Sequence, residues 1–283
     1  MGTAATTIQG LIRRAASSYT AGPTIKDARA VCERFASERI ASTVCYWNND
    51  FDAPLFVAGS YLRLIDIIQG LPAESYLSVK APALGFNLDL LTKILQEARR
   101  IDTTVHFDAM APDSVDRTFT LIDQARRIYP RLGYTLPGRW RRSLHDVDRA
   151  IDFGLRVRVV KGEWCGSNGD ETDRSEGFMK VVERLAAGGA PHVAVATHDA
   201  RLADKALDCL KGAGTSGELE LLYGLPHSAM LNLARRRGVT TRIYVPYGYA
   251  GLPYQLKEVP RNPRILGWFL RDLLRGSPPR KSN

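Results

Sequence analysis

Cysteine is scarce in this chain, and the few present show no metal-binding or disulfide pattern. Cys32, Cys45, Cys165 and Cys209 form no CxxC pair, and no histidine lies at zinc-finger spacing from them. Isolated cysteines of this kind are typical of buried or free thiols in a reducing compartment. We therefore expect no structural zinc and no disulfide scaffold, and we predict a cytoplasmic protein.

Long apolar runs are also missing. The chain has no uninterrupted apolar stretch of about 18 residues, which excludes a spanning helix of ordinary length. Residues 1–18 lack the apolar core of a signal peptide and instead predict an amphipathic helix. With 45% hydrophobic residues among 283, the chain is apolar enough for a large core and too apolar to be disordered.

Acidic residues are outnumbered by basic ones, 30 against 39, which leaves a net charge of +9. Most basic residues are scattered as doublets among acids, as at Arg99–Arg100 and Arg126–Arg127. The dense runs Arg235–Arg237 and Arg280–Lys281 are not interleaved with the aromatics of a single-strand groove. We therefore predict no nucleic-acid partner. Only nine of the basic residues are lysines, so a lysine at a special position is informative.

One pattern repeats along the chain: a short β-branched run, a polar or Gly/Pro turn, and an amphipathic helix. The runs are Ser42–Trp47, Tyr76–Lys80, Thr104–Asp108, Gly133–Pro137, Arg156–Lys161, His192–Thr197, Glu218–Tyr223 and Arg242–Tyr247. Apolar residues at three- and four-residue spacing predict helices between them, for example Leu88–Arg100, Ser114–Ile128, Leu144–Phe153, Met179–Ala187, Leu202–Leu210 and Ala229–Arg237.

Strands that read as apolar runs and alternate with helices indicate a parallel sheet covered on both faces. Eight such units in under 300 residues favour a distorted (β/α)8 TIM barrel. An open doubly wound sheet is the alternative, but the first strand runs into Trp47–Asp50 instead of a Gly-rich turn. We predict a single domain over residues 1–283. N-terminal helices occupy 1–40, the barrel 41–250, and a long final helix with a tail 251–283.

The active site of such a barrel lies at the C-terminal ends of its strands. The residues there are Trp47, Asn48, Lys80, Asp108, Pro137, Arg139, Lys161, Gly162, Thr197, His198, Asp199, Tyr223, Gly224, Tyr247 and Gly248. A lysine or aspartate ending a buried strand is rarely a packing residue, because an unpaired buried charge is costly. We expect Lys80, Asp108 and Lys161 to be functional, the alternative being an ion network that closes the barrel top.

Metal chemistry is disfavoured at these strand ends. His198 has no HxH partner, no second histidine ends a strand, and His106 lies within its strand. Lys161 is followed by Gly162, where a backbone can approach a ligand closely. This placement suits either a Schiff-base lysine or a lysine that contacts an anionic cofactor.

The strand-end motifs resemble those of the proline dehydrogenase family in order and spacing. They are Arg158–Trp164 (RVVKGEW), Ala196–His198 (ATH), Leu222–Gly224 (LYG) and Arg242–Gly248 (RIYVPYG), against RLVKGAYW, ATHN, MLYG and RxYVPYG in the family. Tyr76–Lys80 resembles the family's second-strand lysine motif, and Phe107–Asp108 its third-strand aspartate. The resemblance covers about residues 76–264, most of the chain.

The resemblance implies an FAD enzyme that takes a hydride from a carbon bonded to nitrogen and leaves an imine. It places Arg158 near flavin N5, with Lys161, Gly162 and Trp164 along the cofactor. Thr197, His198 and Tyr223 belong to the rest of the cofactor site, with Thr197 and His198 on the ribityl, phosphate or adenosine portion. It places Lys80, Asp108, Tyr244, Tyr254 and Lys257 at the substrate end.

The chain departs from the family where the substrate is held. The family's YxxRRxxE pattern, whose arginine pair binds the substrate carboxylate, becomes Tyr254–Arg261 (YQLKEVPR), with Lys257 and Glu258 at the arginine positions. Lysine cannot form the planar fork, and a glutamate repels a carboxylate. Glu258 and Arg261 also form an i,i+3 pair that suits a solvated helix face. Further departures are Pro137 for a flavin-contacting glutamine, Glu163 for alanine, Trp164 for tyrosine and Cys165 for tryptophan.

We therefore expect that free L-proline is not the preferred substrate of a flavin-dependent amine or imino-acid dehydrogenase. Two alternatives stay open: a Schiff-base aldolase or lyase that uses Lys161 or Lys80, and an inactive descendant that binds a ligand. The electron acceptor (quinone, oxygen or a flavoprotein) and the oligomeric state stay open as well.

Overall fold

The computed structural model describes residues 19–248, which form a closed barrel of parallel strands in the order β1 to β8. The strands are β1 (Ala41–Tyr46), β2 (Ser75–Val79), β3 (Val105–Phe107), β4 (Leu132–Pro137), β5 (Arg156–Val160), β6 (Val193–Ala196), β7 (Gly217–Leu222) and β8 (Thr240–Tyr247). Each overlaps one of the runs identified in the sequence. The predicted (β/α)8 barrel is therefore confirmed, and the open doubly wound sheet is excluded.

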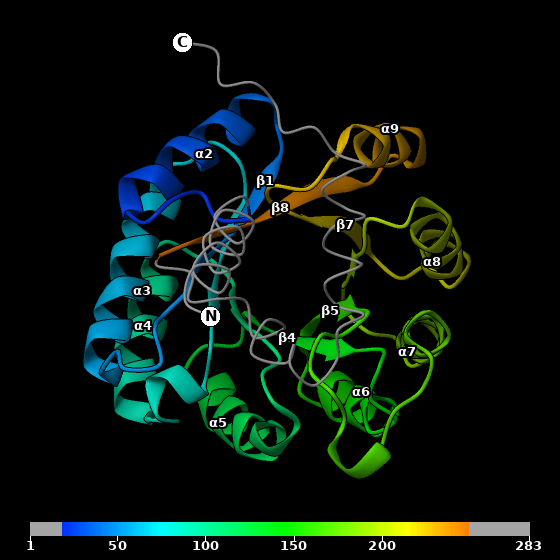
Figure 1. Cartoon of the computed structure of the whole chain (residues 1–283), viewed down its shortest axis with the longest axis horizontal. Coiled ribbons are helices and arrows are strands. Elements are labelled where there is room, and N and C mark those ends of the chain that lie inside the picture. The colour runs from blue at the N-terminus through cyan, green and yellow to red at the C-terminus, as the bar shows by residue number, and fades with distance from the viewer. Residues whose placement is uncertain (1–18, 249–283) are drawn as a thin grey trace, which may run out of the picture.

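Helices surround the barrel as a ring (Figure 1). They are α2 (Ile25–Ser37), α3 (Pro54–Gln69), α4 (Leu88–Arg100), α5 (Val115–Ile128), α6 (Ser143–Asp152), α7 (Arg174–Ala187), α8 (Ala200–Gly212) and α9 (Ser228–Arg237), with 3-10 turns at Pro82–Leu84, Pro112–Ser114 and Ser167–Gly169. The described part of the predicted N-terminal extension, α2, packs against β1 and β8 and takes a place in this ring. It begins at a capping box in which Thr24 and Asp27 bond to each other's backbone.

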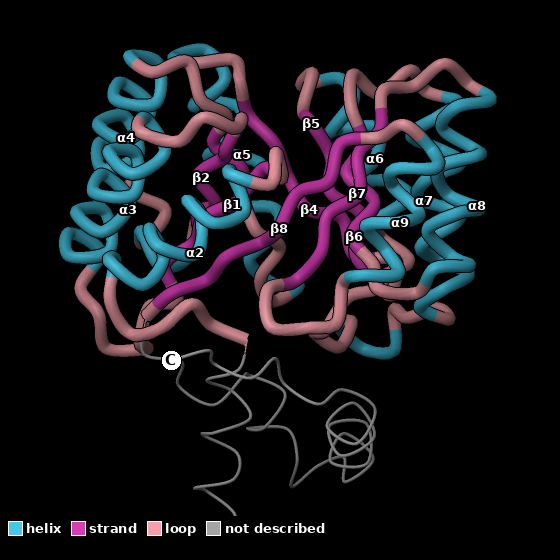
Figure 2. Tube along the Cα trace, turned by 90° about the horizontal axis from the view of Figure 1, so that it is seen from above, coloured by secondary structure: helices cyan, strands magenta, loops and turns pink. Residues whose placement is uncertain are grey.

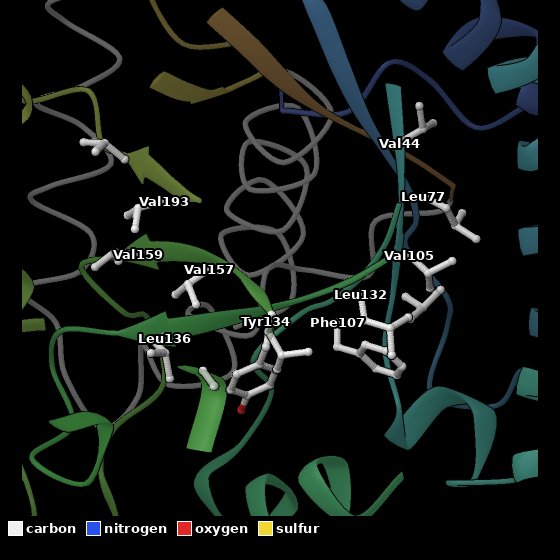
Figure 3. Close-up of a cluster of buried hydrophobic side chains, with 14 of the residues drawn as sticks. Val44, Leu77, Val105, Phe107, Leu132, Tyr134, Leu136, Val157, Val159 and Val193 are labelled. Carbon is white, nitrogen blue, oxygen red and sulfur yellow. The ribbon is translucent and has the colours of Figure 1, made fainter. Parts of the chain in front are cut away.

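The helices lie outside the strands (Figure 2), and the apolar core is built from residues of both. Every second strand residue points outward, and most of these outward residues are apolar, as Figure 3 shows for Val44, Leu77, Phe107 and Val159 among others. Their side chains are almost completely buried. Transfer of this surface out of water is the main force holding the helical ring to the barrel.

The barrel interior is polar, which the sequence analysis did not anticipate. The buried polar side chains Thr43, Tyr76, Ser78, Thr104, His106, Thr135, Arg158, Glu218, Glu220 and Arg242, together with the partly buried Tyr244, alternate with the outward residues. Contacts between strands that are not neighbours, such as Arg158 on β5 with Tyr244 on β8, show that these side chains face the barrel axis. On this inner face charges pair with each other inside the barrel.

The inner polar side chains form two clusters. The lower cluster, Tyr76, Arg156, His192, Glu218 and Arg242, comes from the N-terminal half of the barrel strands. The upper cluster, which lies nearer the C-terminal ends of the strands, consists of Ser78, Asp108, Arg158, Glu220 and Tyr244.

Within residues 19–248 no helix has both the length and the hydropathy needed to cross a membrane.

Candidate active site

Asp108, directly after β3, is the centre of the upper cluster. Its Oδ1 accepts hydrogen bonds from Ser78 Oγ at 2.7 Å and from Arg158 Nη1 at 2.8 Å. Its Oδ2 accepts from the Tyr244 hydroxyl at 2.7 Å, and the Cys45 thiol lies 3.6 Å away. Four strands, β1, β2, β5 and β8, therefore direct donors at one carboxylate at the C-terminal end of the barrel.

Arg158 lies between two carboxylates. Its Nη1 donates to Asp108, its Nε donates to Glu220 Oε2 at 2.8 Å, and its guanidinium lies 5.0 Å from the centre of the Tyr244 ring. The side chain is only 6% exposed. Burial alone lowers the pKa of a guanidinium, but the charges of Glu220 and Asp108 outweigh burial and raise the pKa of Arg158. Arg158 therefore stays charged inside the barrel.

Two polar atoms of this cluster have no partner among residues 19–248. Arg158 Nη2 and Glu220 Oε1 are both buried and make no hydrogen bond. Leaving a buried donor or acceptor unpaired costs free energy unless a ligand or water satisfies it. These atoms fit a cofactor or substrate that offers a hydrogen-bond acceptor and donor above the cluster.

The tyrosine and cysteine of the cluster are held protonated. Burial, together with the Asp108 charge, raises the pKa of Tyr244 well above its usual value. Burial raises the pKa of the Cys45 thiol to about 12, although the nearby Lys80 charge lowers it in part. Neither group can serve as a base or nucleophile near neutral pH. Both therefore act as hydrogen-bond donors and line the site.

Lys80 lies beside the upper cluster, next to the end of β1. Its Nζ is 3.5 Å from the Tyr46 carbonyl oxygen, 3.5 Å from Asn48 Oδ1, and 5.8 Å from the centre of the Trp47 ring. The residue is only 9% exposed. Among the described residues no carboxylate comes within ion-pair distance of this ammonium. A buried cation held only by neutral groups is suited to receive an anionic group.

The loop after β5 carries Lys161, Gly162 and Trp164. Lys161 Nζ lies 3.2 Å from Asp199 Oδ2, at the rim of the barrel, and Asp199 also caps α8 through the Leu202 amide. Gly162 has a φ of 92°, and a Cβ there would lie 2.9 Å from Pro137 Cβ. Packing against the end of β4 therefore requires this glycine, and close approach of a ligand is not needed to explain it.

Trp164 and its neighbours are fixed by two residues of the β4–α6 loop. The Trp164 carbonyl accepts from Trp140 Nε1 at 2.9 Å, and Arg139 donates to the Glu163 carbonyl at 3.0 Å and pairs with Glu171 at 2.9 Å. No local pattern in this segment predicts these contacts.

His198 and Tyr223 make structural contacts in this structure. His198 Nε2 accepts from the Leu222 amide at 2.9 Å, and its Nδ1 lies 3.2 Å from the Pro226 carbonyl, which ties β6 to the β7 loop. Both ring nitrogens thus have backbone partners, so a ligand would meet the ring itself. The Tyr223 ring packs edge-on against Phe35 of α2, with centroids 6.3 Å apart. The Thr197 hydroxyl accepts from the Asp199 amide at 3.1 Å.

The structure thus brings Asp108, Arg158 and Tyr244 into direct contact and sets Lys80 next to them. It places Lys161 at the rim, while Tyr254 and Lys257 lie outside the described residues. The sequence analysis missed Glu220, Ser78 and Cys45, which lie inside strands. A polar residue at every second position, as in Glu218-Leu219-Glu220, was the available signal. In residues 19–248 no group of histidine, cysteine, aspartate and glutamate side chains is arranged to hold a metal ion.

Comparison with known proteins agrees with the motifs. No family model matches the chain. Proline dehydrogenase 2 of Bacillus subtilis is 24% identical over 225 residues, 75% of this chain and 74% of that protein. The proline dehydrogenase of Deinococcus radiodurans is 24% identical over 286 residues, 92% of this chain and 90% of that protein.

Solved structures share the fold. Proline utilization A of Bdellovibrio bacteriovorus superposes with a TM-score of 0.76 at 17% identity, over 96% of this chain and 35% of that one. Its counterpart from Corynebacterium freiburgense gives 0.68 at 14% identity, over 92% of this chain and 32% of that one. The chain therefore spans about a third of the length of these larger proteins.

The chain is thus similar to proline dehydrogenases in sequence and to proline utilization A in fold. The chain is a divergent relative of the proline dehydrogenases, as its motifs predicted. The roles of the individual site residues stay predictions.

Proposed function

We propose that this protein oxidises a carbon–nitrogen bond of a small amine, imino acid or related nitrogen compound to an imine. A bound FAD would supply the acceptor, at its N5, for the hydride that leaves the substrate carbon, and the proton on the substrate nitrogen would pass to solvent. The observation that carries the proposal is the upper cluster, in which a buried, charged Arg158 keeps Nη2 free of protein partners at the catalytic end of the barrel.

The described residues fit FAD on this side of the barrel. When bound, the cofactor supplies an acceptor for two electrons and a hydride. Arg158 offers a fixed positive charge and an unpaired N–H group for the flavin ring. Lys161 is 35% exposed at the rim, where an ammonium can pair with a phosphate. Gly162, Trp164, Thr197, His198 and Tyr223 lie on the loops around it and complete the predicted cofactor site.

The other residues of the cluster orient Arg158 and bound the substrate. Asp108 holds the Arg158 Nη1 and the Tyr244 hydroxyl at the same time, so the tyrosine is a wall of the pocket and not a proton acceptor. Lys80, the buried ammonium without a carboxylate partner, receives an anionic group of the substrate where one is present. In this proposal Tyr254 and Lys257 complete the substrate end.

The substrate we propose is a nitrogen compound other than free L-proline. The named relatives are proline dehydrogenases, whereas this chain carries Lys257 and Glu258 where the family pattern has two arginines. One lysine point charge beside a glutamate binds a carboxylate less well than a pair of guanidinium forks. An amine or hydrazine without a carboxylate, an altered cyclic amine, or an acid held by Lys80 fits better.

The test is the visible spectrum of the purified protein, reconstituted with FAD and titrated anaerobically with L-proline and a panel of amines. We expect a bound flavin that an amine bleaches and that L-proline bleaches slowly. Turnover of L-proline at rates usual for its relatives, with a dye acceptor, contradicts the substrate assignment. A protein that binds no FAD contradicts the proposed class.

Two controls sharpen this test. Lys80→Met removes the buried ammonium. It should therefore weaken the binding of substrates that carry an acidic group and leave the binding of amines without such a group little changed. Borohydride reduction in the presence of a carbonyl compound tests the Schiff-base alternative. This alternative stays open because Lys80 is buried and has no carboxylate partner among the described residues. Covalent trapping on Lys80 or Lys161 in a protein without flavin favours the aldolase or lyase.

A further inference from the structure

Glu220 contacts Arg158 differently from the way Glu218 contacts Arg242. The Glu218–Arg242 pair has two parallel bonds, Nε to Oε1 at 3.0 Å and Nη2 to Oε2 at 3.2 Å. The Glu220–Arg158 pair has one bond, Nε to Oε2 at 2.8 Å, and leaves Arg158 Nη2 and Glu220 Oε1 unpartnered. The upper pair therefore fixes one edge of the guanidinium and keeps its Nη2 available.

Within the trio Arg158, Asp108 and Glu220, two carboxylates face one guanidinium. Arg158 contacts two carboxylates, and the three side chains are 6%, 12% and 3% exposed for Arg158, Asp108 and Glu220. Asp108 is needed to hold Tyr244 and Ser78 as well, whereas Glu220 makes no other hydrogen bond. Glu220 thus adds a second buried negative charge whose one contact is the arginine. In such a dry site a charge acts strongly on its surroundings.

We infer that Glu220 is a positioning residue that holds Arg158 by its Nε edge and partly neutralises it, so that the flavin is harder to reduce. This inference rests on the proposed function, because it takes the flavin to lie next to Arg158. A positive charge near the flavin ring favours the reduced, anionic form. A carboxylate that offsets this charge therefore lowers the flavin reduction potential, and a lower potential favours transfer of the electrons onward over their removal from the substrate.

The experiment is a measurement of the flavin midpoint potential, by dye-coupled reduction, in the FAD-loaded full chain and in Glu220→Gln. Glutamine keeps an acceptor for Arg158 Nε and removes the charge. We expect the equilibrium constant for two-electron reduction to rise at least tenfold, which is a shift of about 30 mV to more positive potential. A tighter flavin–arginine contact should also move the visible absorption bands.

Glu218→Gln is the matched control, since Glu218 lies two residues earlier on β7 and pairs with Arg242 instead. We expect it to change the same equilibrium constant by less than about twofold, because the Arg242 charge lies in the lower cluster. Equal shifts in the two variants would contradict a specific role for Glu220.

Glu220→Asp keeps the charge but withdraws it from Arg158, so its shift should have the same sign and be smaller. This variant carries the test if Glu220→Gln does not fold. An unchanged or more negative potential in a flavin-bound variant overturns the inference and leaves the proposed function intact. A wild-type chain that binds no added FAD overturns both.

Discussion

The two charged clusters inside the barrel are built from the same kinds of residue and differ in how their central arginines are paired. In the lower cluster Arg242 is fully buried and donates to Glu218 and to the Ser42 and Glu74 carbonyls. In the upper cluster Arg158 keeps one nitrogen without a partner. Unpaired buried atoms also occur in the lower cluster, at Tyr76, Arg156 and His192, so what separates the clusters is the saturated guanidinium of Arg242 among the described residues. The open nitrogen of Arg158 lies toward the C-terminal ends of the strands, where barrels of this kind bind their ligands.

The largest expected effect is on stability, from breaking the lower cluster. Arg242→Met leaves Glu218 buried without its guanidinium, and loss of one partner of a buried pair costs about 3–5 kcal/mol. Urea denaturation followed by circular dichroism measures this loss. The double variant Arg242→Met/Glu218→Gln should recover part of it, since no charge is then left alone. A loss below about 1 kcal/mol in the single variant would show that the pair is dispensable.

Acid should reveal the same cluster in the wild type. Arg242 and His192 outweigh the effect of burial and lower the pKa of Glu218 from 4.5 to about 2. A lowered folded-state pKa gives stability that is full above pH 4.5 and lost as the pH falls toward 2, about 3 kcal/mol in total. The slope of unfolding free energy between pH 5 and 2 should be shallower in Glu218→Gln. Equal slopes in both proteins would remove Glu218 from the explanation.

In the upper cluster the main effect should be on activity. Arg158→Lys keeps the charge, but a point charge cannot contact Asp108 and Glu220 and still present a fixed N–H group. Removing one preorganised donor lowers kcat/KM by about 100-fold or more. Steady-state turnover with the substrate that bleaches the flavin measures this. Retention of most activity would mean that the guanidinium geometry is not used.

A smaller effect should follow from crowding the space between the clusters. A Cβ at Gly133 would clash with His106 Nδ1 and the Arg156 carbonyl, so Gly133→Ala forces the buried His106 to move. Overpacking of this kind costs about 1–3 kcal/mol. His106 is also bonded to Thr135, which contacts Arg158. Thermal unfolding together with the flavin spectrum shows whether the displacement stays local or reaches the upper cluster.

The smallest effect on stability should come from the rim. Lys161 and Asp199 are 35% and 45% exposed, so Lys161→Ala should change the free energy of unfolding by less than about 1 kcal/mol. FAD affinity should nevertheless fall about tenfold if this ammonium pairs with a phosphate. Lys180→Ala on α7, which breaks the exposed pair with Glu176, is the matched control and should change neither quantity. Unchanged FAD binding in Lys161→Ala would remove it from the cofactor site.

Site residues at the ends of strands can be predicted from the sequence, whereas those inside the strands cannot. Lys80, Asp108 and Lys161 could be selected because a charge directly after an apolar run has few structural explanations. Glu220 lies within a run that reads as a buried strand, and its period-two alternation does not say which face is polar. That Arg158 pairs with Glu220 while Arg242 pairs with Glu218 depends on the register of strands far apart in the chain.

Neighbours also changed the meaning of residues that were correctly located. Gly162 was chosen for ligand approach, yet the end of β4 fills the space where its side chain would be. His198 was chosen for the cofactor, yet both of its ring nitrogens meet backbone atoms of the next loop. The position of such a residue along its own strand can be predicted from the sequence. Its contact partners lie far away in the chain, and no local pattern predicts them.

The bond from Arg242 to the Ser42 carbonyl has a consequence for how the protein is made. It joins residues 200 positions apart, at the seam where β8 pairs with β1. At about 5–20 residues per second a ribosome needs roughly 10–40 s to cover that distance. During this time one edge of β1 has no strand to pair with and can attract other chains. Early-acting chaperones that cover this edge would therefore raise the yield of correctly closed barrels.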